Sequence, residues 1–121
     1  MSKVKSATKI FEAMKKGMIK LTVFYPFSED KSFNMDYYCD RHVNLVKESM
    51  GDFLKAITVE KGLAGLTPNS PAPYFAMGNM YFDSLETFQT AFSNAGNLMA
   101  DIPNFTDTEP QIKISEVMIE E

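Results

Sequence analysis

The sequence predicts an α+β fold of the ferredoxin-like type, in which a four-stranded antiparallel sheet carries two helices on one face. The first observation is the order of periodic segments, which reads strand, helix, strand, strand, helix, strand. The second is that each half of this order forms a strand–helix–strand crossover, which is right-handed in almost all proteins. The third is size and composition, since 121 residues with 45% hydrophobic and 23% charged side chains suit one folded domain.

The first strand and the first helix flank a polar loop. Apolar and polar residues alternate over Ile19–Tyr25, and Pro26 is expected to end this strand. Asn34 is suited to cap the helix that follows, because its side chain can accept a hydrogen bond from a free backbone N–H group. The helix is expected to continue to Met50 and to stop at Gly51.

Two further strands follow, over Leu54–Lys61 and Tyr74–Asp83, and the Gly- and Pro-rich segment 62–73 is the loop between them. Gly78 lies in the middle of the second of these strands. A glycine in a strand interior indicates a bulge or the close approach of another group.

The second helix is expected to open at Asp83 and Ser84, with Asp83 and Glu86 at the spacing of a capping box. Its apolar stripe consists of Leu85, Phe88, Ala91 and Phe92. The segment 111–119 alternates again and is the last predicted strand.

The strand over residues 74–83 is apolar at both of its alternating sets of positions. One set is Tyr74, Ala76, Met80 and Phe82, and the other is Phe75, Met77 and Tyr81. Two helices cover only one face of a sheet, so the opposite face would expose a large apolar patch. The sequence therefore predicts a homodimer in which a second copy packs on that face.

Charge divides the chain into a basic N-terminal extension, residues 1–17, and a globular domain, residues 18–121. Residues 1–20 hold six lysines and one acid, a balance of +5, whereas residues 21–121 hold six bases and fifteen acids, a balance of −9. An acidic body argues against nucleic acid as a partner. No apolar run approaches the roughly 18 residues of a membrane span. A single cysteine fits a reducing compartment, so a cytoplasmic location is expected.

The candidate site is the helix that carries His42, the one histidine of the chain. Helical spacing places Met35, Tyr38, His42, Leu45 and Val46 on one face, which must turn toward the sheet. Two interpretations follow. His42 is either a core histidine satisfied by a local hydrogen bond, or an acid–base group that lines a cavity. In the second case Tyr37, Tyr38 and Asp40 are candidate donors or orienting groups.

Other kinds of site have little support in the sequence. A metal site would need Cys39 or carboxylates beside the one histidine, and helical spacing turns Cys39 away from it. Asp36 and Asp40 are expected to form a solvated helix edge near Arg41. For these reasons no metal is expected. No Gly-rich phosphate motif follows a strand, so a dinucleotide cofactor is not expected either.

Several segments together resemble the EthD family, named for ethyl tert-butyl ether degradation. They are "MIKLTVFYP", "FNMDYYCDRHVNLV", "GLAGLTPNSPAPYFAMGNMYFDSLETFQTAF" and "MADIPNFTDTEPQIKISEV". The resemblance extends from Met18 to Val117, and its signature is Tyr37 and Tyr38 followed by His42, with the Pro-rich loop and "APY" downstream.

The resemblance implies a dimeric α+β barrel and a role in xenobiotic or ether breakdown beside a haem monooxygenase system. It also implies an oxidoreductase association and a site formed by His42, Tyr38 and Tyr37. Similar barrels include cofactor-free monooxygenases, muconolactone isomerases and polyketide cyclases, so the fold does not select one reaction. Three hypotheses stay open: a small enzyme acting on an apolar or aromatic metabolite, a non-catalytic binding or accessory protein, and a purely structural dimer.

Overall fold

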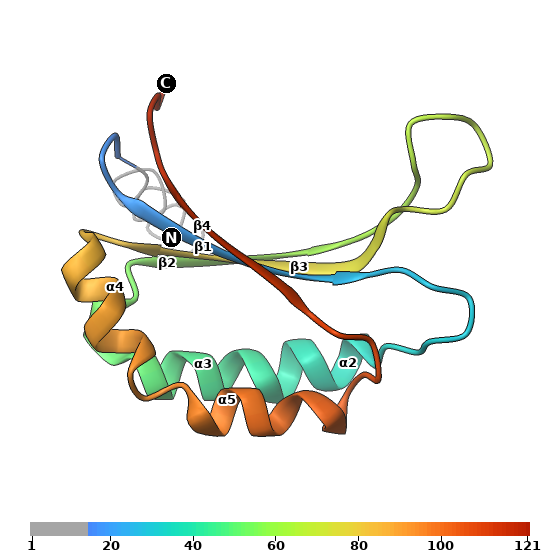
Figure 1. Ribbon diagram of the computed structural model, residues 1–121, viewed down its shortest axis with the longest axis horizontal. Helices are drawn as coiled ribbons and strands as arrows, with labels where there is room; N and C mark the ends of the chain where they lie inside the picture. Colours follow the sequence, from blue (N-terminus) through green and yellow to red (C-terminus); the bar gives the residue numbers. More distant parts are fainter. Residues whose placement is uncertain (1–14) are drawn as a thin grey trace, which may run out of the picture.

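A computed structural model describes residues 15–121, so most of the predicted N-terminal extension, residues 1–17, lies outside the described part. The chain forms two layers, a sheet and a layer of helices on one of its faces (Figure 1). The strands are β1 (Ile19–Pro26), β2 (Ala56–Lys61), β3 (Tyr74–Phe82) and β4 (Gln111–Glu116). All neighbours are antiparallel, and the four-stranded sheet has the order β2-β3-β1-β4. This order confirms the predicted ferredoxin-like fold.

The first helical element is continuous but changes its winding. It consists of α2 (Met35–Tyr37), a π-helical turn (Tyr38–His42) and α3 (Val43–Met50). The side chain of Asn34 accepts a hydrogen bond from the N–H of Tyr37 at 3.0 Å, which confirms the predicted cap. Gly51 ends the helix with φ of 56°, as expected of a glycine stop. The π-helical turn was not predicted; within it the N–H of Val43 donates to the carbonyl of Tyr38, five residues earlier.

The second helical region differs from the prediction in two respects. It comprises α4 (Leu85–Phe92) and α5 (Gly96–Asp101), whereas the sequence indicated one helix. The capping box joins Ser84 and Thr87, each backbone N–H donating to the other side chain at 3.1 Å, so the predicted Asp83–Glu86 pairing is wrong by one residue. Leu85 is 50% exposed and lies outside the buried stripe. Among residues 15–121, no helix is long and apolar enough to cross a membrane.

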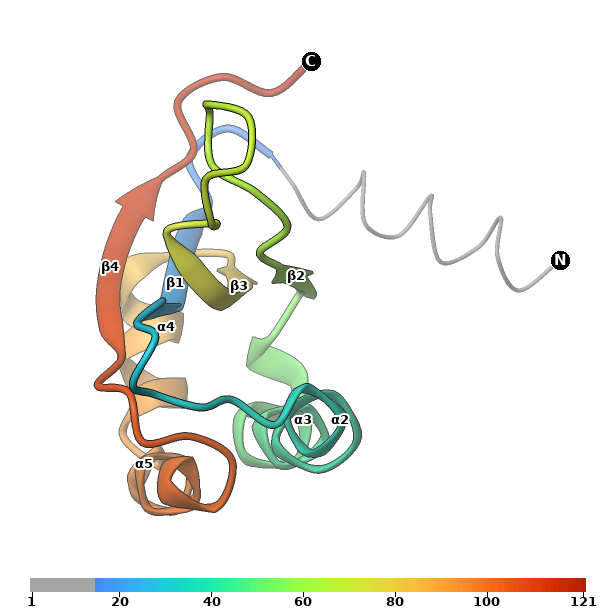
Figure 2. The same ribbon diagram turned by 90° about the vertical axis from the view of Figure 1, so that its right-hand side faces the viewer.

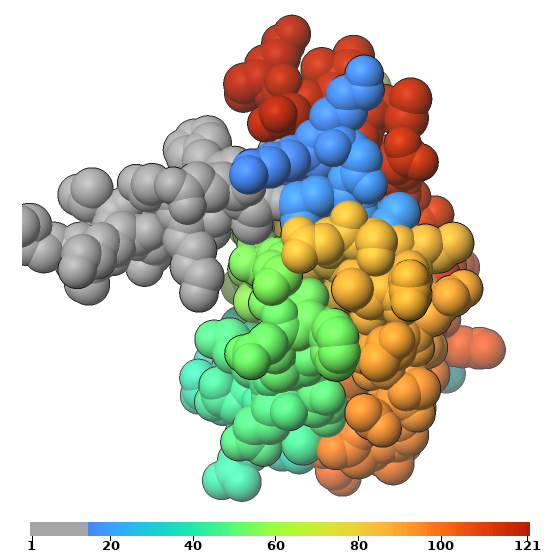
Figure 3. All heavy atoms as spheres, turned by 90° about the vertical axis from the view of Figure 1, so that its left-hand side faces the viewer, coloured from blue at the N-terminus to red at the C-terminus, as the bar shows by residue number. Residues whose placement is uncertain are grey.

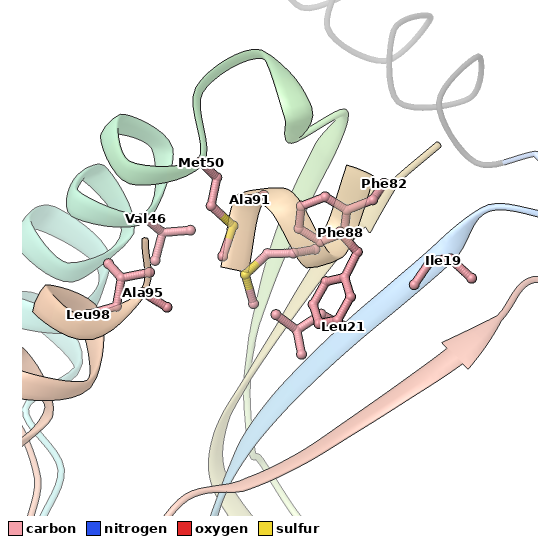
Figure 4. Close-up of a cluster of buried hydrophobic side chains, with 10 residues drawn as sticks. Ile19, Leu21, Val46, Met50, Phe82, Phe88, Ala91, Ala95 and Leu98 are labelled. Carbon is pink, nitrogen blue, oxygen red and sulfur yellow. The ribbon is translucent and has the colours of Figure 1, made fainter. Parts of the chain in front are cut away.

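The helices pack side by side beneath the sheet, with α2–α3 next to α5 (Figure 2). The main core lies between these layers, and Figure 4 shows side chains from α3, α4 and α5 directed toward those of the sheet. Its members include Leu21, Val46, Met50, Phe82, Phe88 and Leu98. Figure 3 views the end where α4 packs against the 3₁₀ turn after α3 and closes the core.

No helix of the described residues covers the opposite face of the sheet (Figure 1). Asn79 lies at the centre of this face and is 1% exposed. Its side chain accepts a hydrogen bond from Thr22 at 3.1 Å and donates to Thr58 at 3.3 Å and to Glu60 at 3.0 Å. The half-buried Met77 and the buried Tyr81 lie on either side of Asn79 along β3, so the apolar side chains of this face enclose a polar centre that the sequence did not indicate.

Phe75 belongs to a second core cluster, which is mainly aromatic. The pairing of β1 with β3 shifts between Tyr25 and Pro26, so that Phe75 has no direct partner on β1. Its ring stacks on Phe33 at 5.8 Å. This cluster packs around Tyr25 and Tyr38 and forms one wall of the site described next.

Candidate functional site

The centre of the site is a hydrogen bond between His42 and Asp101. His42 is 6% exposed, and its Nδ1 lies 2.9 Å from Oδ2 of Asp101, at the end of α5. An ionised carboxylate only accepts hydrogen bonds, so Nδ1 carries the proton in this contact. In the neutral imidazole Nε2 then keeps its lone pair. The contact therefore selects one tautomer, in which Nε2 is the basic nitrogen.

Asp101 is itself held by two further donors. Its Oδ1 accepts a hydrogen bond from the Tyr37 hydroxyl at 2.7 Å and another from the Asn104 side-chain amide at 2.9 Å. Burial is the largest single influence and raises the pKa of Asp101, but the hydrogen bonds from Asn104, His42 and Tyr37 together outweigh it and lower that pKa below its ordinary value. Asp101 thus stays ionised and fixes the orientation of the imidazole.

Tyr38 stacks on His42 within the π-helical turn. Their ring centroids are 5.6 Å apart and the ring planes differ by 18°. Tyr38 is 3% exposed, and burial raises the pKa of its hydroxyl. The hydroxyl is therefore a hydrogen-bond donor at neutral pH. π-helical turns occur frequently at functional sites, because they change which side chains face the same way.

Tyr38 and His42 line a cavity between the helices and the sheet. Its volume is about 40 Å³, measured as the space open to the centres of water-sized molecules. The walls are mainly aliphatic and include Leu21, Val23, Val46, Ile57, Leu98 and Ile102. Met50, Met80 and Met99 also line it, and methionine side chains adjust readily to a ligand. The arrangement combines a small apolar chamber with a few inward polar groups, which is the composition, though not the volume, of a typical ligand pocket.

Phe105 forms the wall behind the imidazole. Its ring centroid lies 4.7 Å from that of His42 and 5.2 Å from that of Tyr38. The backbone carbonyl of Phe105 accepts a hydrogen bond from the N–H of Asn34, at the start of the helix. Phe105 thus connects the segment after α5 to the helix that carries the site.

Gly78 lies against the Tyr38 hydroxyl, at a position where the sequence predicted a bulge or a close approach. A Cβ atom at this position would lie 2.6 Å from the hydroxyl oxygen of Tyr38. Real Cβ atoms essentially never come this close to another atom, so the strand backbone leaves space for the tyrosine hydroxyl. The structure confirms the close approach and identifies Tyr38 as the approaching group.

Replacing Gly78 by Ala is expected to displace the Tyr38 hydroxyl and to lower the free energy of unfolding by about 1–3 kcal/mol, as overpacking does. Denaturant unfolding would measure the loss. The double variant with Tyr38→Phe lacks the clashing oxygen and should recover most of it. A Gly78→Ala protein as stable as the wild type would contradict this packing.

The structure brings three of the residues predicted for the site together: Tyr37, Tyr38 and His42. Other polar residues of the same stretch, Asp36, Cys39, Asp40 and Arg41, are exposed on the outer side of the helix. In the described part of the chain no group of three His, Cys, Asp or Glu residues is placed to hold a metal ion.

Sequence reasoning missed Asp101, Asn104 and Phe105. Asp101 is 59 residues away from His42 along the chain, so helical spacing could not reveal it. One signal was available. All three residues lie in "DIPNF", which belongs to one of the segments that carry the family resemblance.

The comparisons with known proteins agree with this architecture. The family model described as the EthD domain matches residues 28–109. The crystal structure of an EthD-like protein from Ralstonia eutropha JMP134 is 42% identical, with a TM-score of 0.81, and the match covers 88% of this chain and 97% of that one. An ethyl tert-butyl ether degradation family protein from Bacillus halodurans C-125 is 23% identical, with a TM-score of 0.65 and coverages of 84% and 99%. No curated protein matches the chain. The match to the family model and the identity to the Ralstonia protein show that this chain belongs to the EthD family.

Proposed function

We propose that this protein is a small enzyme of xenobiotic, ether or aromatic metabolite breakdown, in which His42 transfers protons to and from an apolar ligand. Tyr38 would donate a hydrogen bond to an oxygen atom on which negative charge develops. Tyr37 would act through Asp101 to hold the imidazole in place. The chemistry would be a cofactor-independent oxygenation, isomerisation, cyclisation or dehydration, associated with oxidoreductase pathways.

The observation that carries this proposal is the polarity of the imidazole. Nδ1 faces Asp101, so the basic Nε2 is left for a ligand. His42 also lines the cavity, and no other histidine exists in the chain. A histidine needed only for packing would not require two further polar side chains, Tyr37 and Asn104, around its partner carboxylate.

The alternative is a non-catalytic accessory protein that holds a ligand for a haem monooxygenase system. The same cavity and the same hydrogen bonds would then serve binding alone. The modest volume of the cavity, about 40 Å³ for the centres of water-sized molecules, favours a compact ligand in either case.

Replacing His42 by Gln separates these two functions. We expect purified wild-type protein, without added cofactor, to convert a member of a panel of small ethers, phenols and cyclic ketones, as detected by mass spectrometry. His42→Gln should lower the rate by about 10²- to 10⁴-fold, the usual contribution of an acid–base group. Asp40→Asn, on the exposed edge, is the control and should keep the wild-type rate. Full turnover by His42→Gln would contradict acid–base catalysis, whereas ligand binding without turnover by the wild type would favour the accessory function.

We further propose that the active form is a homodimer in which the second copy packs on the open sheet face. The half-buried Phe24 and Met77 and the buried Tyr81 lie on this face, beside the Asn79 network. Polar groups of this kind can specify how two copies align.

Light scattering during size-exclusion chromatography tests the homodimer. The wild type should have twice the mass of one chain, and Met77→Asp should dissociate it. Leu85→Asp, which places the same charge on the exposed helical side, should remain dimeric. A wild type that elutes as a monomer would contradict the dimer.

A further inference from the structure

We propose that the hydroxyl groups of Tyr25 and Tyr38 form a two-donor site for an oxygen anion inside the cavity. The ligand class that fits is a neutral molecule with a weakly acidic oxygen, either a phenol or an enolisable carbonyl compound. This inference deepens the proposed function and rests on it for the proton acceptor, His42. Tyr25 had no predicted role.

The first support is that both hydroxyls lack a protein partner. Tyr25 is 1% exposed and Tyr38 is 3% exposed, and among residues 15–121 neither hydroxyl has a hydrogen bond to another side chain or to the backbone. In this part of the chain, every side-chain oxygen or nitrogen that is fully closed off has a hydrogen-bond partner. Since the two tyrosine hydroxyls have no partner, they are not fully closed off and must border open space. The cavity is the space that both residues line.

The second support is the position of the two rings. Tyr25 projects from β1 and Tyr38 from the helix, and their rings meet edge to face at 5.6 Å and 76°. The Tyr38 hydroxyl lies against Gly78 on β3, and Tyr25 pairs with Ala76, two residues away on the same strand. The two tyrosines thus enter the cavity from opposite layers, and their rings meet there.

Protonation favours donation by both groups. Burial is the main cause that raises the pKa of Tyr25 and of Tyr38, and for Tyr25 the neighbouring Tyr38 and Asp101 add to it. Both hydroxyls therefore keep their protons at neutral pH. Two hydroxyl donors in an apolar chamber stabilise a developing oxygen anion far better than they do in water.

The walls of the cavity define the charge of the incoming ligand. No lysine, arginine, aspartate or glutamate of the described chain lines it. A carboxylate or phosphate group would lose its water there without a compensating cation, which is costly. A neutral ligand avoids this cost, because its negative charge would develop only after Nε2 of His42 accepts its proton. The electron pair then stays on the ligand oxygen, and the imidazolium faces the Asp101 carboxylate.

Fluorinated phenols test this site without knowledge of the natural substrate. We would titrate the full chain with para-fluorophenol and with a more acidic trifluorophenol, both un-ionised in neutral water, and follow binding by ¹⁹F NMR. Fluorobenzene and the matching trifluorobenzene, which lack the hydroxyl, are the controls for apolar binding, and para-fluorobenzoate is the control for charge.

We expect each phenol to bind at least about 10-fold more tightly than its matched benzene, and the more acidic phenol to bind more tightly than the weaker acid. Tyr25→Phe and Tyr38→Phe should each weaken phenol binding by about 10- to 100-fold, the usual worth of a hydrogen bond to a charged group. Both variants should leave fluorobenzene binding unchanged, which also shows that the cavity is intact.

Three results would overturn the two-donor site. These are the absence of phenol binding, phenol affinity that either Tyr→Phe variant leaves unchanged, and tighter binding of fluorobenzoate than of the phenols. The outcome is separable from that of the proposed function. Phenol binding that depends on both tyrosines, together with full turnover by His42→Gln, would retain the oxyanion site and reject His42 catalysis. Phenol binding that does not depend on the tyrosines, together with loss of turnover in His42→Gln, would reject only the oxyanion site.

Discussion

Replacing Asp101 by Asn is expected to lower catalytic turnover by about 10²- to 10⁴-fold while the fold stays intact, because the neutral amide no longer requires a proton on Nδ1 of His42. The amide can donate to Nδ1 as well as accept from it, so the tautomer with the proton on Nε2 becomes accessible. That tautomer has no basic nitrogen facing the cavity. Turnover at a saturating ligand concentration, with circular dichroism as the check on folding, measures the effect.

The matched control for this variant is Tyr37→Phe, which removes one hydrogen bond to Asp101 but keeps the carboxylate and its contact with His42. It should reduce turnover much less. Acid unfolding adds a readout. Since the pKa of Asp101 is lowered in the folded state, its charge stabilises the fold above the ordinary carboxyl pKa, and this contribution is lost as the pH falls through the folded value. Asp101→Asn should lack this acid-dependent loss. Wild-type turnover in Asp101→Asn would contradict a positioning role.

Replacing Phe105 by Ala is expected to lower the free energy of unfolding by about 3–5 kcal/mol, the usual cost of deleting a buried phenyl ring. Phe105 is 4% exposed. Its ring lies within 6.1 Å, between centroids, of those of Tyr25, Phe33, Tyr37, Tyr38 and His42. The substitution would also remove the ring that packs on the imidazole, so the His42 side chain should no longer be held in one orientation.

Denaturant unfolding of Phe105→Ala and of Phe53→Ala makes the comparison. Phe53 is 41% exposed, so its replacement deletes the same atoms with little loss of packing. If the two variants lost the same free energy of unfolding, the result would contradict a stabilising role of the aromatic cluster around the site.

The part of the fold predicted from the sequence depends on local signals. Alternation over Ile19–Tyr25, the Asn34 cap and the Gly51 stop each act within a few residues, and the structure contains all three. The glycine in β3 indicated a close approach for the same reason, since a strand interior rarely favours glycine. The order of elements then leaves few topologies, so the sheet order could be inferred.

The rest of the site depends on packing between distant segments. The π-helical turn between Tyr38 and His42 has no marker in the residues themselves. Asp101 meets His42 only because α5 packs beside α3, and the sequence did not reveal α5 as a separate helix. Asn79 was overlooked because its neighbours on β3 are apolar, although its side chain is paired across three strands.

Nitrogen NMR of the imidazole tests most directly whether His42 presents a basic nitrogen to the cavity. The chain has one histidine, so the two ring nitrogen signals need no further assignment to a residue. In the neutral form we expect Nδ1 to have the shift of a protonated nitrogen and Nε2 that of an unprotonated one, with the pattern lost in Asp101→Asn. A wild-type spectrum with the proton on Nε2 would contradict the proposed role of His42.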